Sequence, residues 1–357
     1  MLLGAVLYLL LFVFRHFPTE VFPLMANLFA SSGLVAAEFV SDRPAAWQWW
    51  AAGIVALLIL VAMFVCAYRT RTGVIARATT KEAIRQPLFL LLLFVALLLI
   101  VVNSFLPFFS LGEDFKMLKD CGLATVLISG LLLAVWTSST SIASEIEGKT
   151  AMTLLSKPIT RRQFVVGKYV GILHGVLALI IPLMIALSVA IFFRVGYDSR
   201  ESGRGDLEYF VLQELEWLPG WSAYLPHPQR LAEVLQVLPG YGLIFLEIAV
   251  LAAISVAIST RSPMVANVVS CLAIFVVGHL TPVLVQSGEL QFEVVEFMAR
   301  LIATVLPNLD SFNVSAAVAT GQLIPPLYLL EALVYSVAYI AAAILLSFIL
   351  FEDRDLA

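Results

Sequence analysis

The sequence predicts an all-α integral membrane protein, and its composition, its apolar blocks and its loop charges each support this fold class. Of the 357 residues, 61% are hydrophobic and 13% are charged, and the mean hydropathy is +0.98. A soluble domain carries about 25% charged residues. The apolar residues form long uncharged blocks, and a helix needs about 20 such residues to cross about 30 Å of hydrocarbon. Charged residues gather between the blocks, as they do in membrane-protein loops.

The predicted membrane spans follow from blocks that carry no charge or a single acid, and the span 165–193 also includes Lys168 near its start. These spans are 49–68, 88–109, 121–143, 165–193, 241–260, 263–285 and 327–351. A further apolar run at 1–14 would reach only about 21 Å at the helical rise of 1.5 Å per residue. Whether this first run crosses the membrane is therefore left open.

The loop charges predict the orientation of the chain, because Lys and Arg are retained on the cytoplasmic side. More than half of the 21 Lys and Arg residues fall on one set of loops, and the C-terminal tail belongs to that set. We therefore expect a multi-pass protein of the plasma or inner membrane with a cytoplasmic C-terminus. The segments 194–239 and 286–326 then lie outside. The first contains "LEYFVLQELEWL" and "RLAEVLQVL", whose spacing predicts short amphipathic helices on the outer surface.

The segment 72–86 is predicted to form an interfacial elbow helix before the span that starts near Pro87. Arg77, Lys81 and Arg85 recur every four residues, so their side chains form one stripe along the helix. Such a stripe can face anionic headgroups, which makes membrane lipid an expected partner. Pro87 fits the first turn of the following helix, where a missing N–H costs nothing.

The most charged short stretch, "SEIEGKTAMTLLSKPITRRQFVVGKYVG", separates two long apolar blocks. Its spacing predicts a short amphipathic helix over 145–159, interrupted at Pro158, followed by the basic start of a new helix. "EGKT" is similar to the end of a phosphate-binding loop, but that motif needs a Gly at the position of Ala143 and a preceding strand. We therefore predict that this chain binds neither nucleotide nor metal, and no catalytic set of side chains can be assembled.

A longer run, "IASEIEGKTAMTLLSKPITRRQFVVGKYVG", resembles the signature of ABC transporter permeases of the type-2 exporter class. The basic elbow, "LPNLDSFN" before the last span and the terminal "FEDRDL" extend the resemblance over residues 72–357. The resemblance implies a six-helix type-2 ABC permease core over that range. Residues 1–71 then form an N-terminal extension with one or two extra transmembrane helices.

The resemblance also implies that 145–159 is a coupling helix, which docks on a separate ABC ATPase subunit that binds ATP and Mg. The chain itself is then not an enzyme. A second permease protomer, identical or related, is the other expected partner, and the net charge of −4 gives no reason to expect nucleic acid. The residues assigned to the ATPase contact are Glu145, Glu147, Gly148, Thr150, Leu154, Leu155, Pro158, Arg161 and Arg162. Secondary contacts, with the ATPase or the membrane surface, are assigned to Arg77, Lys81, Arg85 and Arg261.

Two acids, Glu247 and Glu331, fall inside predicted spans, where a carboxylate marks a pathway, a buried partner or an interfacial position. The spans place both near the outer boundary. Asn267 and His279 are expected to form hydrogen bonds between helices.

The leading hypothesis is a permease subunit that exports an unidentified substrate. One alternative is a non-transporting membrane scaffold that relays ATPase motion to an external protein complex. Another is an ion-coupled secondary transporter, which requires Glu247 or Glu331 to titrate in a cavity.

Overall fold

The computed structural model describes residues 69–105, 114–143, 160–201, 203, 205–214, 222–286 and 306–352, together with Leu58, Val61, Ala62 and Val65. The possible N-terminal helix 1–14 and the predicted coupling helix 145–159 lie outside these residues, as does most of the predicted span 49–68.

Long helices make up most of the described chain. They are α4 (Arg71–Arg85), α5 (Pro87–Phe105), α6 (Asp114–Ser138), α9 (Arg161–Glu201), α10 (Pro228–Ser259), α11 (Met264–Gln286) and α14 (Pro326–Glu352). Shorter elements are the π-helical turn η2 (Ser139–Ala143), the 3₁₀ turn η3 (Asp310–Phe312), α13 (Ser315–Ala319) and the strands β1 (Phe210–Glu214) and β2 (Ser222–Pro226).

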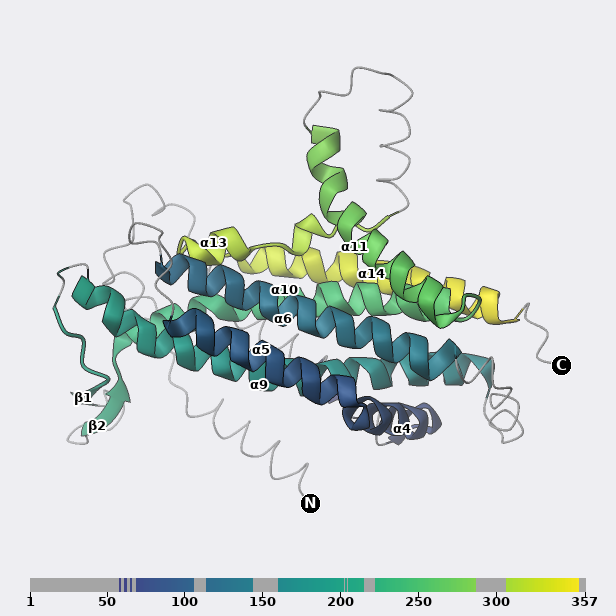
Figure 1. The fold of residues 1–357 in the computed structure, drawn as a ribbon, viewed down its shortest axis with the longest axis horizontal. Coiled ribbons are helices and arrows are strands. Elements are labelled where there is room, and N and C mark those ends of the chain that lie inside the picture. Colours follow the sequence, from purple (N-terminus) through teal and green to yellow (C-terminus); the bar gives the residue numbers. More distant parts are fainter. Residues whose placement is uncertain are drawn as a thin grey trace.

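The helices pack into an elongated bundle in which α10 lies against α6, α9 and α14 (Figure 1). The core is aliphatic: Leu133 of α6, Ile180 of α9 and Ile248 of α10 have no exposed surface. By contrast, α5 and α14 expose large apolar side chains such as Phe94 and Val334. A bundle that is apolar inside and outside suits a surrounding lipid phase rather than water.

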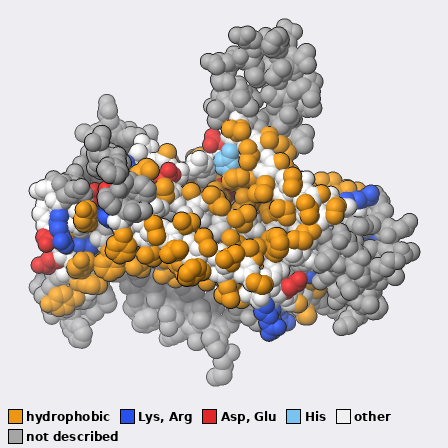
Figure 2. Space-filling model, in the orientation of Figure 1, with side chains coloured by type: hydrophobic (Ala, Val, Ile, Leu, Met, Phe, Trp, Pro, Cys, Tyr) orange, Lys and Arg blue, Asp and Glu red, His pale blue; other side chains and the backbone are white. Residues whose placement is uncertain are grey.

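Five of the described helices are long and apolar enough to cross a membrane, namely α5, α6, α9, α10 and α14. Helix α11 is also apolar, over Met264–Leu280. Figure 2 shows hydrophobic side chains covering the middle of the bundle, while charged side chains gather towards its two ends. The predicted fold class, an all-α integral membrane protein, is confirmed.

The segment 194–239 differs from the prediction of short amphipathic helices. Helix α9 continues to Glu201, and α10 already begins at Pro228. Between them, β1 and β2 form an antiparallel hairpin in which Val211 lies opposite Leu225. The sequence "FVLQE" was therefore wrongly expected to be helical, because its cross-strand pairing depends on partners 8 to 16 residues further along the chain.

A buried arginine holds this hairpin against the bundle. Arg230 of α10 has no exposed surface, and its guanidinium donates to the carbonyl oxygens of Phe192 (2.7 Å) and Leu207 (2.8 Å). It also lies 4.3 Å from the ring centre of Tyr209. Gly196 makes room for it, because a Cβ there would lie 2.0 Å from Nη2 of Arg230.

His227 caps the start of α10 next to this arginine. Its Nδ1 accepts a hydrogen bond from the amide of Gln229 at 3.3 Å. Burial lowers the pKa of His227, and the positive charge of Arg230 lowers it further, although Glu208 acts in the opposite direction. The lowered pKa favours the neutral imidazole, and only the neutral ring can accept that hydrogen bond.

An ion pair ties α6, α10 and α13 together near the same end, which we call the hairpin end. The ammonium of Lys119 lies 2.5 Å from Oε2 of Glu233, and the Lys119 side chain is 1% exposed. The same ammonium lies 3.5 Å from the carbonyl oxygen of Val318 and 4.5 Å from the ring centre of Phe115. These contacts give a buried cation the partners that it needs.

Candidate functional site

The predicted contact residues that the structure describes lie at the opposite end of the bundle. This end, which we call the α4 end, comprises α4, η2, the first turns of α9, the α10–α11 turn and the C-terminus of α14 (Figure 1). The predicted residues outside the described chain are Glu145, Glu147, Gly148, Thr150, Leu154, Leu155 and Pro158. They belong to the segment that joins η2 to α9, so both of its attachment points lie at the α4 end.

Helix α9 starts with a reciprocal cap directly after this segment. The hydroxyl of Thr160 accepts from the amide of Gln163 at 3.2 Å, and Oε1 of Gln163 accepts from the amide of Thr160 at 3.2 Å. This arrangement is a capping box, which satisfies two amides that the first helical turn leaves without partners. The cap fixes the residue at which α9 begins, and Arg161 and Arg162 lie in its first turn.

The predicted contact arginines hold the C-terminus of α14. Arg161 donates to the carbonyl oxygen of Phe351 at 3.2 Å, and Arg261 from the α10–α11 turn donates to that of Leu350 at 3.2 Å. Arg162 lies 5.9 Å from the ring centre of Phe348. Cations at a helix C-terminus satisfy the last carbonyls and oppose the negative end of the helix dipole. The structure thus brings Arg161, Arg162 and Arg261 together around one helix end.

We expect that Arg161→Ala combined with Arg261→Ala will loosen the last turn of α14. Each lost hydrogen bond from a charged donor is worth about 1.5–3 kcal/mol when buried and less at a surface. Amide hydrogen exchange of the peptide that contains Phe351 should accelerate about tenfold, whereas exchange at the start of α14 should not change. Equal exchange of this peptide in the double variant and in the wild type would contradict the capping role.

Helix α4 is fixed to α9 along a line of glycines, Gly167, Gly171 and Gly175. A Cβ at Gly171 would lie 2.6 Å from the carbonyl oxygen of Ala76, and one at Gly175 would lie 2.9 Å from Cβ of Ala83. Thr80 donates from its hydroxyl to the carbonyl oxygen of Gly171 at 3.1 Å. The spacing of four residues puts the glycines on one face of α9, so the two backbones approach closely. The elbow helix is therefore rigidly attached to the bundle.

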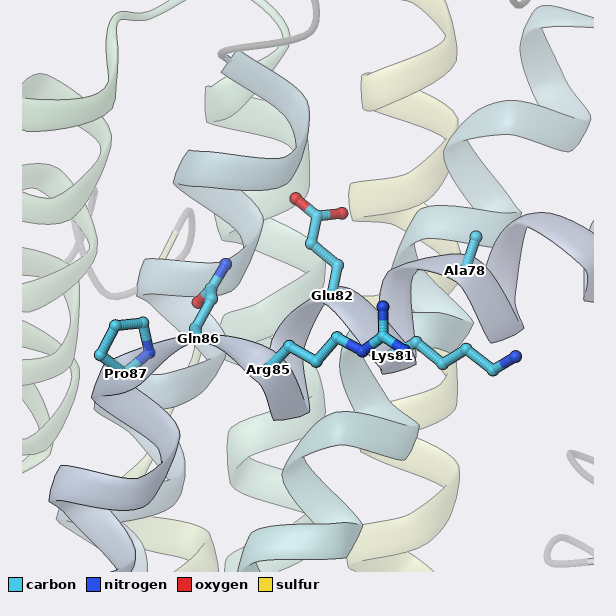
Figure 3. Close-up of a pocket in the computed structure, with 6 residues that line it drawn as sticks. All are labelled: Ala78, Lys81, Glu82, Arg85, Gln86 and Pro87. Carbon is cyan, nitrogen blue, oxygen red and sulfur yellow. The ribbon is translucent and has the colours of Figure 1, made fainter.

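The basic stripe of α4 lies on its exposed side. Arg77, Lys81 and Arg85 are all exposed, while Ala76 and Ala83 on the opposite side are buried. Figure 3 shows that the carboxylate of Glu82 points away from the ammonium of Lys81. The helix thus directs three cations outward and one acid towards a different set of neighbours.

Those neighbours belong to η2, the π-helical turn that ends α6. Oε2 of Glu82 accepts from the hydroxyl of Ser141 at 3.3 Å, and the buried ammonium of Lys168 donates to the same hydroxyl oxygen at 2.7 Å. Lys168 also lies 3.7 Å from Oε2 of Glu82. One turn further along α4, Gln86 donates to the hydroxyl of Thr140 at 3.1 Å. Side chains from α4 and α9 therefore meet at η2.

Helices α10 and α11 reach η2 from its other side. Asn267 of α11 donates from Nδ2 to the hydroxyls of Ser139 at 2.7 Å and Ser255 at 3.0 Å. Ser255 of α10 also hydrogen-bonds Ser138, and Cys271 lies 3.4 Å from Oδ1 of Asn267. The interhelical role predicted for Asn267 is confirmed. The contacts of Ser138, Ser139, Thr140 and Ser141 with α4, α9, α10 and α11 form a single set, which we call the η2 network.

The two intramembrane acids differ from each other in environment. Glu247 is 1% exposed and lies well inside α10, because that helix begins at Pro228 rather than near 241. The depth of Glu247 in the membrane, which the sequence places in the outer half or near the outer boundary, stays a prediction. Glu331 is exposed in the first turns of α14, near the end of a helix, as an interfacial position requires.

Glu247 faces His279 of α11, with 3.5 Å between Oε1 and Nε2. Nδ1 of His279 donates to the carbonyl oxygen of Phe275 at 3.0 Å, so Nε2 is the nitrogen that remains for Glu247. The separation is long for a hydrogen bond, and Oε1 has no other partner among the described side chains. In the described part of the chain no group of three His, Cys, Asp or Glu side chains could hold a metal ion.

The sequence analysis missed Glu82, Gln86 and Lys168, although two signals pointed to their positions. The glycine spacing in "GKYVGILHG" marks the face of α9 that receives α4, and Lys168 follows its first glycine. The hydroxyl run "TSSTS" at the end of α6 marks a helix end that needs polar partners. Neither signal identifies which helix supplies the partner.

The fold and the α4 end define a multi-pass helical membrane protein whose charged segment is held between two anchored helices. Residues 109–212 match the family model described as ABC-2 family transporter protein. The match includes α6, η2, the segment 144–159 and α9. The match supports the resemblance found in the sequence, and over these residues the chain is similar to ABC-2 family transporter proteins. None of the curated proteins matches the chain.

Proposed function

We propose that this chain is the membrane-spanning permease subunit of an ATP-driven transporter and exports a substrate with energy from a separate ATPase. The family match over 109–212 carries the proposal, since it includes the segment that would contact the ATPase. ATP and Mg would bind to the partner ATPase rather than to this chain. The α4 end would face the cytoplasm, because most of the basic loop residues lie there.

The proposed mechanism uses the anchoring of the segment 144–159 at both ends. Closure of the ATPase pair would push this segment, and the push would reach α6 through η2 and α9 through its capped first turn. Packed helices respond to such a push as rigid bodies. A second protomer would complete the pathway, because one six-helix core is half of the usual assembly of the class that the sequence resembles.

Co-purification with the partner ATPase tests the contact. We expect Glu147→Arg combined with Leu155→Asp to abolish it, because the double variant places a reversed charge and a buried charge in the interface. Glu208→Arg combined with Leu323→Asp makes the same changes at exposed positions of the hairpin end and should leave co-purification intact. Retention of the ATPase by the Glu147 and Leu155 variant would refute the assignment of 145–159.

The scaffold alternative is favoured by one observation at the hairpin end. Tyr209, Phe210 and Tyr224 of the β hairpin region are 45%, 52% and 75% exposed, which makes an aromatic surface suited to an external protein. ATP turnover of the reconstituted complex that rises with an external protein, and not with any lipid or small solute, would favour the scaffold over the exporter.

A further inference from the structure

Two hollows lie next to each other where α4, α5 and α6 meet, and they share Gln86 and Pro87. Each has a volume of about 570 Å³. The first is lined on α4 by Ala78, Lys81, Glu82 and Arg85 (Figure 3). The second is lined by Leu88 and Leu91 of α5, Trp136 of α6 and Thr140 of η2. Together they form one groove with a basic half and an apolar half, which we call the elbow groove.

The basic half of the groove is lined by two cations and by one acid whose charge is paired with a lysine of the bundle. Lys81 and Arg85 are one helical turn apart and both are exposed. The third charged side chain of the lining, Glu82, points away from Lys81 and interacts with Lys168 and Ser141 of the bundle. A negatively charged group in this half would therefore meet two cations and little opposing charge.

The apolar half begins at the first turn of the apolar helix α5. Pro87 starts the apolar helix α5, and Leu91 one turn further is 57% exposed. Trp136 of α6 is 38% exposed and faces the same hollow. Tryptophan favours the zone between headgroups and hydrocarbon, because its ring is apolar and its N–H is polar. An occupant of the whole groove thus needs an anionic part at the α4 side and an apolar part along α5.

We propose that the elbow groove binds one anionic phospholipid, with the phosphate on Lys81 and Arg85 and an acyl chain along Leu88, Leu91 and Trp136. The charge complementarity and the succession of a basic half on α4 and an apolar half at the start of α5 both select a lipid. A second copy of the chain or an apolar segment would cover the leucines but would leave the two cations without an anion. The site includes no residue of the proposed coupling helix 145–159, and it assigns Lys81 and Arg85 to lipid rather than to the ATPase.

The position of the groove connects it to the η2 network. Glu82 and Gln86 line the groove, and they are also the α4 side chains that bond Ser141 and Thr140. A headgroup held beside them braces the junction between α4 and α5 at the point where α4 contacts η2.

Quenching of Trp136 fluorescence by brominated lipids tests the site in the full chain, reconstituted in phosphatidylcholine vesicles. Brominated phosphatidylglycerol and brominated phosphatidylcholine are compared at equal mole fraction, and Trp136→Phe isolates the emission of this residue. We expect preferential quenching by phosphatidylglycerol. Lys81→Gln and Arg85→Gln should each reduce the preference on the order of fivefold, as expected for one basic residue at a membrane surface.

Arg77→Gln is the matched control, since it removes the same charge from the same exposed side of α4 at a residue outside the groove lining. It should retain the preference. Equal quenching by both lipids, an unchanged preference in the Lys81 and Arg85 variants, or an equal loss in Arg77→Gln would each overturn the proposal. So would the absence of quenching by either lipid, which would mean that protein covers Trp136.

Discussion

Gly171→Ala should destabilise the protein and detach α4 from α9. The added Cβ would lie 2.6 Å from the backbone oxygen of Ala76 and 2.6 Å from Cβ of Thr79. Because a backbone atom is involved, the two helices must move apart rather than adjust a rotamer. Overpacking of this kind costs about 1–3 kcal/mol, and it should outweigh the gain of at most about 1 kcal/mol in helix propensity from Gly to Ala. The free energy of unfolding in mixed micelles measures the net loss.

Gly242→Ala is the control for this prediction, because nothing lies within 4 Å of the added Cβ in α10. It makes the same chemical change in a helix and should be neutral or stabilising. Hydrogen exchange provides a second readout, since α4 amides should exchange faster in Gly171→Ala alone. If the two variants unfold at the same denaturant concentration, the close packing of α4 on α9 does not contribute to stability.

The positions of the long helices are the part of the fold that the residue pattern determines most directly. A block such as 88–109 has to become a helix in lipid, because its backbone groups find no other partners there. The structure has α5 from Pro87 to Phe105 in this region. The residues that bound the helices locally, Pro87 and the Thr160–Gln163 capping box, are visible in the sequence.

Tertiary partners were not predictable in the same way. Arg161 and Arg261 are basic residues in loops, a pattern equally typical of an ATPase contact and of a helix cap. Their bonds to Phe351 and Leu350 depend on where α14 ends in space. For a related reason, the sequence did not show that α10 starts before its apolar block and includes the polar "PQRLAEVLQ".

If the chain acts as the proposed permease subunit, Lys168→Met should uncouple it from the partner ATPase without breaking the complex. Met keeps the length and apolar stem of Lys168 but removes the ammonium that bonds Ser141 at 2.7 Å and pairs with Glu82 at 3.7 Å. Within the described chain, these contacts link α9 and α4 to η2, from which the segment 144–159 departs. Because the Glu82 side chain is 42% exposed, water can solvate its carboxylate after the change, so the fold should survive.

The expected result follows from the size of typical coupling energies. Loss of one link between two sites costs about 1–3 kcal/mol, or about 5- to 150-fold in the coupled property. We expect the stimulation of ATP turnover by this chain to decrease by about 5- to 150-fold, while the ATPase still co-purifies.

Lys116→Met removes a cation from an exposed position of α6 at the hairpin end and should leave stimulation unchanged. Full stimulation in Lys168→Met would show that the push does not pass through the η2 network. Loss of co-purification would mean instead that Lys168 maintains the docking surface. The Glu147 and Leu155 variant should lose co-purification, whereas Lys168→Met should lose only the stimulation of ATP turnover. The two assays therefore distinguish the segment that contacts the ATPase from the residues that relay its motion.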